Sequence, residues 1–531
     1  MTIPEYITEQ LARSGVKYVF GVPGGPSIPY IEAFRAGGIE FILTSHEAGA
    51  AIMADVTSRL TGVPGVCHGT FGPGATNLTT GAGLSLLDRS PVLIFTSEMP
   101  DSLEGRTVQM KIDHQLLFSA VTKKSFRLSS QNAGTVIRQA LAACYDEYPG
   151  PVHIGLPSDL AYTEAAESFP EPEDFRDEAP YNDVNSIIGA LGKARRPLLA
   201  VGLTAARFGL KKKISDFLAN YPMAVVLTPM AKGLLDTDHV CYGGVLFHAL
   251  SDCLEDIFQK TDLVIGLGYD QVEYNYESWI PDVPLVHFNV KDTDLPARQD
   301  VLKYTGSPSE WFELLRNLNQ GQLILESAVL KGIRDEMKSV FNGFMSHFGP
   351  VSALSILKEE LPQDAIVTAD VGSHLHVIGQ FWEPRSPERL LITNGWSSMG
   401  FGIPAAVAAA LNSRSSQVFC ITGDGGFLMS SGELMTARRL GLSIKVVVFS
   451  DGELNLIKLK QSWKDVPQYA TTICDSGMFL SDSYLGIRVL NAGTSDEMRE
   501  CVRLALQMKE SVIINAVIDP EDYRWLVVRQ K

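Results

Sequence analysis

The chain has 531 residues, of which 45% are hydrophobic and 20% charged, and its formal net charge is −16 at pH 7. A chain of this length is too long to fold around a single hydrophobic core, and its length predicts about three domains. The acidic balance argues against nucleic acid as a partner, because phosphate backbones are met by clustered Lys and Arg. No apolar run approaches the ~20 residues of a membrane helix, so we expect no membrane partner.

The cysteines indicate a reducing compartment. There are seven of them, scattered and without a Cys-x-x-Cys pair, which is typical of free thiols rather than of a disulfide framework. The first residues carry Glu5, Glu9 and Arg13 where a signal peptide would have an apolar core. We therefore expect a cytoplasmic protein.

Short β-branched runs alternate with amphipathic stretches along the chain, a pattern that predicts parallel sheets flanked by helices. In the first third the predicted strands are Tyr18–Phe20, Glu40–Leu43, Gly65–His68, Pro91–Phe95 and Val152–Gly155. A polar linker is predicted over Ser168–Asn182. The middle strands are Leu198–Val201, Ala224–Leu227, Leu263–Gly266 and Leu285–Phe288, and a mostly helical segment follows over Pro308–His347. The predicted strands of the last third are Ile366–Ala369, Val418–Ile421, Ile444–Phe449 and Val512–Val517. The expected fold is α/β, with three doubly wound parallel-sheet domains over 1–165, 183–320 and 345–531.

Two acids stand at the ends of consecutive strands in the third domain. The run Gly423-Asp424-Gly425-Gly426 follows one strand, and Asp451 follows the next. Open α/β sheets bind ligands at the carboxyl ends of their strands, and glycines let the backbone approach a phosphate. Mg²⁺ prefers carboxylates together with phosphate oxygens. This favours a metal-bound diphosphate, although a Gly-Asp-Gly-Gly run by itself could be an ordinary turn.

A third acid, Glu47, follows a strand of the first domain in Ser45-His46-Glu47-Ala48-Gly49 and opens a small-residue helix. By itself it could be a helix N-terminal acid favoured by the helix dipole. Together these motifs resemble the thiamine-diphosphate-dependent enzymes, whose cofactor motif opens with Gly-Asp-Gly and closes with an acid or amide. The resemblance implies pyrimidine-binding, central and diphosphate-binding domains, in that order. It also implies that Glu47 activates the coenzyme, and that Asp424, Asp451 and the backbone carbonyl of Glu453 hold Mg²⁺. Most members have Asn at the position of Asp451.

The same resemblance extends to other coenzyme contacts. The carbonyl of Ser397 would accept from the pyrimidine amino group, and Met399 would wedge between the two rings, although a Met is often core filler. His374 could contact the diphosphate or be a structural histidine. The remaining expected contacts are Pro23, Gly74, Asn77, Gly372, Ser373, Gly423, Gly425, Gly426, Asn455, Leu456 and Ile457.

Within the family the chain is most similar to the catabolic, FAD-independent acetolactate synthases. The segment 268–274 (Gly-Tyr-Asp-Gln-Val-Glu-Tyr) and the Asp451-x-x-x-Asn455 spacing carry this resemblance. It implies decarboxylation of pyruvate and carboligation to a second 2-oxo acid, with the backbone N–H of Gly25 near the substrate and no FAD. Segment 268–274 could also be a strand and loop without a ligand role.

The loop 109–115 departs from that pattern. Gln109 stands four residues before Asp113, where acetolactate synthases have a spacing of three. His114 could protonate an intermediate, bind an acceptor carboxylate, or be a surface or interface histidine. Three other functions stay open: a simple 2-oxo acid decarboxylase, a carboligase with another acceptor such as an amine or aldehyde, and a non-catalytic homologue. The resemblance also implies a homodimer or homotetramer with its active site at a subunit interface.

Overall fold

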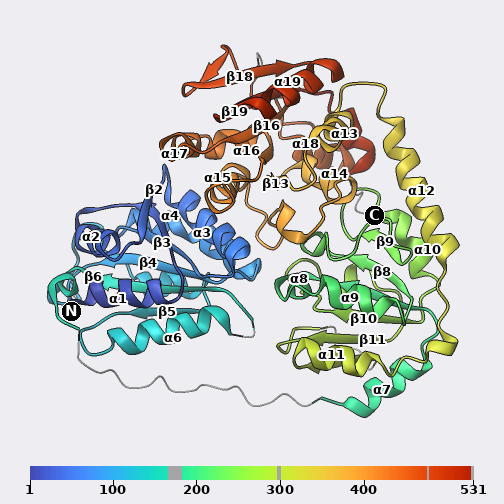
Figure 1. Cartoon of the computed structure of the whole chain (residues 1–531), viewed down its shortest axis with the longest axis horizontal. Coiled ribbons are helices and arrows are strands. Elements are labelled where there is room, and N and C mark those ends of the chain that lie inside the picture. The colour runs from blue at the N-terminus through green and yellow to red at the C-terminus, as the bar shows by residue number, and fades with distance from the viewer. Residues whose placement is uncertain (104, 147, 166–181, 296–299, 475–476, 528–531) are drawn as a thin grey trace. The chain divides into compact units, whose positions relative to one another are not determined.

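The computed structural model describes residues 1–103, 105–146, 148–165, 182–295, 300–474 and 477–527. It contains three β-sheets, drawn from blue to red along the chain in Figure 1. The chain divides into two compact units. One holds the first sheet together with residues 395–415 and 430–444, and the other holds the second and third sheets.

The first sheet has the strand order β2-β1-β3-β4-β6-β5, and its strand pairs are parallel. Its strands are β1 (Tyr18–Val22), β2 (Glu40–Leu43), β3 (Gly65–Gly69), β4 (Val92–Glu98), β5 (Lys124–Arg127) and β6 (Pro151–Pro157). The helices of this unit are α1 (Ile3–Arg13), α2 (Ile28–Ala36), α3 (Glu47–Thr61), α4 (Pro73–Leu87), α5 (His114–Ser119), α6 (Ala133–Tyr145), α15 (Gly402–Asn412) and α17 (Glu433–Arg439).

Helix α3 lies at the centre of this unit and packs against α4, α15 and the sheet. Its small residues permit this close packing: a Cβ added at Gly81 of α4 would lie 2.3 Å from the Cβ of Ala51. The helix ends at Gly62, whose φ of 69° is left-handed and suits glycine. The first residue of α3 is Glu47, so this packing fixes the helix that carries it.

The second sheet has the order β12-β11-β10-β7-β8-β9 and is parallel. Its strands are β7 (Pro197–Val201), β8 (Ala224–Leu227), β9 (Tyr242–Val245), β10 (Leu263–Leu267), β11 (Leu285–Asn289) and β12 (Val301–Thr305). The helices of this part are α7 (Val184–Lys193), α8 (Leu203–Arg207), α9 (Lys211–Leu218), α10 (Glu255–Phe258), α11 (Pro308–Leu315) and α12 (Ser327–Gly343).

The third sheet has the order β14-β13-β15-β16-β19-β18-β17, with an antiparallel pair between β17 and β18. Its strands are β13 (Ile366–Ala369), β14 (Leu390–Leu391), β15 (Val418–Gly423), β16 (Ile444–Ser450), β17 (Ser483–Tyr484), β18 (Ile487–Ala492) and β19 (Val512–Val517). The helices are α13 (Pro350–Glu360), α14 (Ser373–Phe381), α16 (Asp424–Ser430), α18 (Asn455–Trp463), α19 (Ser495–Gln507) and α20 (Glu521–Leu526).

The predicted α/β class with three parallel-dominated sheets is confirmed. Every predicted strand is present, whereas β5, β9, β12, β14, β17 and β18 were not predicted. The predicted linker falls, apart from Asn182, outside the described residues. All seven cysteines lie in the described part, and each is a free thiol. No helix within the described ranges is long and apolar enough to cross a membrane.

Candidate active site

Glu47 is a buried carboxyl group at the start of α3, with 7% of its surface exposed. The preceding His46 caps the helix, since its Nδ1 accepts from the N–H of Ala48. Asn77 of α4 donates its Nδ2 to Oε2 of Glu47 at 2.9 Å. A Cβ at Gly74 would lie 3.3 Å from Oε1. Three of the residues expected to contact the coenzyme, Glu47, Gly74 and Asn77, are thus brought together.

The segment 395–400, which holds Ser397 and Met399, has an irregular backbone. Ser397 has φ 53° and Gly400 has φ 86°, so two residues adopt the left-handed region. The N–H of Gly395 donates to Asp88 Oδ1 at 3.1 Å. A turn of this kind persists only where its surroundings hold it.

A buried ion cluster supplies part of that support. Arg59 of α3 contacts Asp55 at 2.8 Å and Asp88 at 2.7 Å, and all three side chains are almost fully buried. The guanidinium also lies over the ring of Phe401, 5.6 Å from its centroid. Because Asp88 also accepts from Gly395, the cluster connects α3, α4 and segment 395–401.

In the other unit, Asp424 and Asp451 follow the neighbouring parallel strands β15 and β16. Oδ1 of Asp424 accepts from the N–H of Gly425 at 2.8 Å, and Oδ2 from the N–H of Gly452 at 2.7 Å. Burial raises the pKa of Asp424. Burial and the nearby charge of Asp424 raise the pKa of Asp451 to about 7. Each ionised carboxylate makes ionisation of the other less favourable, and a divalent cation between them would stabilise both charged forms. The pair therefore suits a divalent cation.

The segment after Asp451 is fixed by side-chain contacts. The carboxylate of Glu453 accepts from Lys458 Nζ at 3.1 Å and from Thr471 Oγ1 at 2.9 Å. Asn455 begins α18 and donates its Nδ2 to Asp451 Oδ2 at 3.1 Å. Leu456 is partly buried and Ile457 is exposed.

Buried polar atoms without partners lie in the same unit, at the start of α14 after β13. Ser373 and His374 are each 4% exposed, and neither Ser373 Oγ nor His374 Nε2 has a hydrogen-bond partner in the described part of the chain. Burial lowers the pKa of His374 to about 4, so its ring is neutral near pH 7. Buried polar atoms are rarely left unpaired, so these two atoms indicate a ligand, and the hydroxyl donor of Ser373 at a helix N-terminus suits an anionic one.

The glycines of the predicted phosphate loop allow close packing. A Cβ at Gly426 would lie 2.8 Å from the carboxylate of Asp370, and one at Gly423 would lie 3.5 Å from the ring of His374. A Cβ at Gly372 would lie 2.7 Å from that ring. Gly425 donates its N–H to Asp424. The residues present therefore fit a diphosphate with a divalent cation.

On the first loop, Pro23 follows β1 and Gly25 opens a 3₁₀ turn, and both are exposed. A Cβ at Gly25 would meet no atom within 4 Å, so space lies open beside it.

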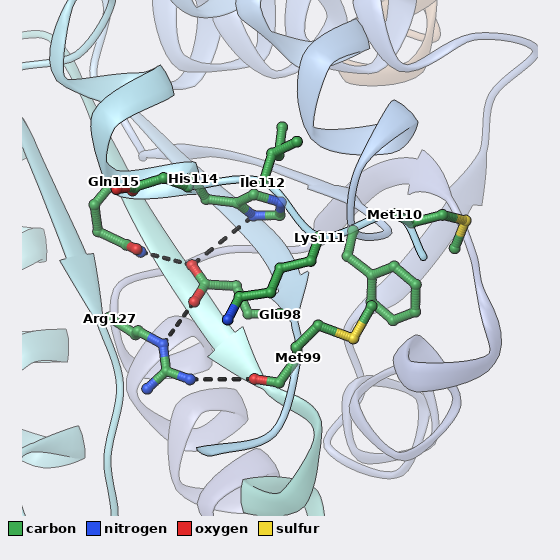
Figure 2. A pocket seen from close by; sticks show the side chains of 10 residues that line it. Glu98, Met99, Met110, Lys111, Ile112, His114, Gln115 and Arg127 are labelled. Carbon is green, nitrogen blue, oxygen red and sulfur yellow. Dashed lines mark hydrogen bonds and ion pairs between the residues drawn. The ribbon is translucent and has the colours of Figure 1, made fainter. Parts of the chain in front are cut away.

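His114 lines a cavity of about 160 Å³ that is also bordered by Glu98, Lys111 and Arg127 (Figure 2). Gln109 is exposed and is not among the residues that line it. Burial lowers the pKa of His114 to about 4. Its Nε2 accepts from the N–H of Gly72 at 3.4 Å, so the neutral ring carries its proton on Nδ1, next to Thr96 Oγ1 at 2.8 Å. The roles predicted for Gln109 and His114 stay predictions.

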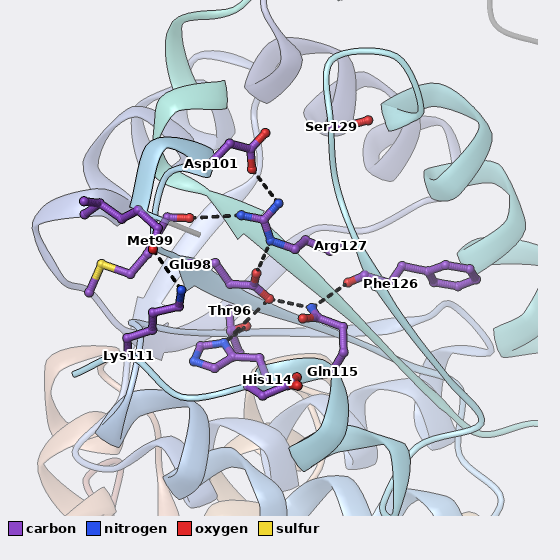
Figure 3. A network of polar contacts seen from close by, with 12 residues as sticks. Thr96, Glu98, Met99, Asp101, Lys111, His114, Gln115, Phe126, Arg127 and Ser129 are labelled. Carbon is purple, nitrogen blue, oxygen red and sulfur yellow. Dashed lines mark hydrogen bonds and ion pairs between the residues drawn. The ribbon is translucent and has the colours of Figure 1, made fainter. Parts of the chain in front are cut away.

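No sequence motif indicated the ion network beside this cavity. Glu98 Oε2 pairs with Arg127 Nε at 2.8 Å, and Glu98 Oε1 accepts from Gln115 Nε2 at 2.6 Å. Arg127 also bonds Asp101 and the carbonyl of Met99 (Figure 3). The Glu98–Arg127 ion pair joins the ends of β4 and β5. It could not be predicted because β5 was not among the predicted strands.

Comparisons with known proteins cover all three parts of the chain. Residues 1–117 match the family model described as "Thiamine pyrophosphate enzyme, N-terminal TPP binding domain", residues 184–314 match its central domain, and residues 370–516 match its C-terminal TPP binding domain. The chain is 30% identical to the acetolactate synthase isozyme 2 large subunit of Escherichia coli, over 99% of this chain and 97% of the relative. Acetolactate synthases of Arthrospira platensis and Bacillus subtilis are 28% and 25% identical, over 97% and 98% of this chain and 94% and 93% of their own lengths.

Proposed function

The chain belongs to the thiamine pyrophosphate enzyme family, and we propose that it decarboxylates a 2-oxo acid such as pyruvate and joins the two-carbon unit to a second 2-oxo acid. The products are a 2-acetyl-2-hydroxy acid and CO₂. The observation that carries the proposal is the pair of acids at β15 and β16 in the same unit as the unpartnered polar atoms of Ser373 and His374.

Thiamine diphosphate would supply the nucleophilic carbon and the electron sink for decarboxylation. Ser373 Oγ would donate a hydrogen bond to its diphosphate, and His374 would contact it through Nε2. Asp424 and Asp451 would bind Mg²⁺ together with phosphate oxygens, and the carbonyl of Glu453 would complete the protein ligands. Their hydrogen bonds to Gly425, Gly452 and Asn455 orient the carboxylates for this task.

Glu47 would hold and transfer a proton at the pyrimidine ring. Its Oε2 is occupied by the amide of Asn77, so a carboxyl proton belongs on Oε1, which lies beside Gly74. The low exposure of the carboxyl group removes water that would compete for that proton.

The geometry of His114 supports carboligation over simple decarboxylation. A decarboxylase that releases an aldehyde needs a proton donor at the reacting carbon, whereas carboligation needs that proton excluded. Both ring nitrogens of His114 have partners, Gly72 and Thr96, and its pKa of about 4 leaves it uncharged near pH 7. His114 is therefore a poor acid in this arrangement.

One contact in the second sheet supports independence from FAD. The buried carboxyl group of Glu273 accepts from the N–H of Leu203 at 3.2 Å and of Met230 at 3.1 Å. These two residues follow β7 and β8, at the sheet edge where α/β folds bind dinucleotides. Because a side chain of the protein takes these donors, we expect no flavin absorbance in the purified protein.

We also propose a homodimer or homotetramer that works in the cytoplasm. Glu47 belongs to one compact unit and Asp424 to the other, which suits a site completed by two subunits.

Product analysis tests the reaction. The purified protein is incubated with thiamine diphosphate, Mg²⁺ and a panel of 2-oxo acids, and the products are identified by mass. We expect acetolactate and CO₂ from pyruvate. Acetaldehyde as the main product would favour the decarboxylase, and no turnover of any 2-oxo acid would contradict the proposal.

A further inference from the structure

A second buried glutamate contacts the turn that precedes Glu47. Glu433 is the first residue of α17 and is 2% exposed. Its Oε1 accepts from the backbone N–H of Ser45 at 3.1 Å and of His46 at 3.0 Å, and its Oε2 lies 3.1 Å from the same N–H of Ser45. One carboxylate thus serves two consecutive amides immediately before Glu47.

Further contacts join the same two segments. Ser45 Oγ donates to the carbonyl of Gly432 at 2.7 Å, and Arg439 Nη2 donates to the carbonyl of Leu43 at 2.5 Å. Thr436 Oγ1 donates to Glu433 Oε2 at 2.7 Å and so orients the carboxylate. Helix α17 and its cap Gly432 therefore contact the connection between β2 and α3 at Leu43, Ser45 and His46.

This connection leaves amides that need a partner. Ser45 and His46 lie between the end of β2 and the start of α3, so neither the sheet ladder nor the helix satisfies their N–H groups. A carboxylate that accepts them makes charge-assisted hydrogen bonds, which are stronger than neutral ones. Without Glu433 the N–H groups of Ser45 and His46 would lose the acceptor that joins them to α17.

Helix α3 packs directly on this carboxylate. A Cβ at Gly49 would lie 2.4 Å from Glu433 Oε1, so only glycine fits there without a shift. The carboxylate is thus held between the turn, α17 and the first turn of α3.

We propose that Glu433 is a positioning residue for Glu47: it fixes the turn 43–46 and thereby the place from which the Glu47 carboxyl group reaches the coenzyme. The inference rests on the proposed function, in which Glu47 activates thiamine diphosphate. A displacement of about 1 Å in a catalytic group can lower a rate by roughly 100-fold, so a small shift of this turn matters.

The first test uses the coenzyme-free full chain. Hydrogen–deuterium exchange is measured for peptides covering residues 43–48 in the parent, Glu433→Gln and Glu433→Met. Gln keeps one acceptor oxygen and Met keeps the volume without an acceptor, so we expect exchange to rise in the order parent, Gln, Met. The control is Glu497→Met, since Glu497 is also a first-turn glutamate that accepts a backbone N–H, from Gly493 at 2.8 Å, but is exposed. Unchanged exchange over 43–48 in Glu433→Met would overturn the proposal.

The second test measures activation of the coenzyme rather than turnover. In the loaded enzyme, the rate at which the C2 proton of thiamine diphosphate exchanges with deuterium is followed by NMR after acid quench. We expect Glu433→Met to slow it about 10- to 100-fold, with Glu433→Gln between Met and the parent. Because Glu433 acts through Glu47, its substitution should add little to the loss in Glu47→Gln.

Gly49→Ala provides a variant that keeps both glutamates. Alanine favours helix over glycine, so the fold is retained, but the new Cβ displaces the Glu433 carboxylate. We expect slower C2 exchange in Gly49→Ala. If Glu47→Gln left C2 exchange at the parent rate, the proposed function would fail. If Glu47→Gln slowed it while Glu433→Met and Gly49→Ala did not, only the positioning role would fail.

Discussion

At the scale of single residues, the metal site and the activating acid are separable. In the proposed metal site Asp451 would contribute both an oxygen ligand and a charge, and its carboxylate accepts from the N–H of Glu453 and from Asn455. Asp451→Asn keeps the oxygen, so we expect Mg²⁺ affinity to weaken by about tenfold, the equivalent of about 1.4 kcal/mol. Asp451→Leu removes the ligand and should abolish measurable binding. Calorimetric titration of Mg²⁺ with thiamine diphosphate present checks both, and parent-like affinity in Asp451→Leu would refute this metal assignment.

Glu47 should affect the rate far more than the binding of the coenzyme. Glu47→Gln keeps the shape and a hydrogen bond but cannot transfer the proton, so we expect kcat to fall by about 10²- to 10⁴-fold. The affinity for thiamine diphosphate should change little, because the residues proposed to bind the diphosphate belong to the other unit. Steady-state kinetics with pyruvate and a coenzyme titration measure the two effects. Parent-like turnover would remove Glu47 from the mechanism.

At the scale of elements, the Arg59 cluster connects α3, α4 and segment 395–401. Arg59→Met leaves the buried carboxylates of Asp55 and Asp88 without their cation, so we expect a loss of about 3–5 kcal/mol in unfolding free energy. A lower thermal midpoint reports it. In the control, Arg35→Met removes an exposed ion pair with Glu32 and should leave the midpoint unchanged. Equal midpoints for the two variants would show that the cluster contributes nothing.

Most of the strands that sequence patterns missed lie at sheet edges. Most predicted strands are buried apolar runs, with the edge strand β2 as an exception, whereas the missed strands β5 (Lys-Ser-Phe-Arg) and β12 (Val-Leu-Lys-Tyr-Thr) are edges with mixed exposure. Edge strands carry polar residues, which weakens the apolar pattern. In the site, local motifs identified Asp424 and Glu47. Glu433 stayed hidden because its partner Ser45 is 388 residues away in sequence.

At the scale of the whole molecule, buried histidines make stability depend on pH. Burial lowers the pKa of His68 from 6.5 to about 4. The unfolded chain therefore takes up a proton first, so the stability that neutral His68 contributes is complete above pH 6.5 and is lost as pH falls towards 4. We expect the thermal unfolding midpoint of His68→Asn to fall less than that of the parent when the pH is lowered from 7 to 5. An equal loss in both proteins would contradict this pKa shift.

In the proposed function the chain binds thiamine diphosphate with Mg²⁺ through the acids at β15 and β16 and the buried polar side chains at the start of α14. Isothermal titration calorimetry of the purified protein with thiamine diphosphate in the presence of Mg²⁺ tests it most directly. We predict saturable binding in the parent, loss of that binding in Asp424→Ala, and its loss when Mg²⁺ is chelated. No heat of binding in the parent, or parent-like affinity in Asp424→Ala, would contradict the account.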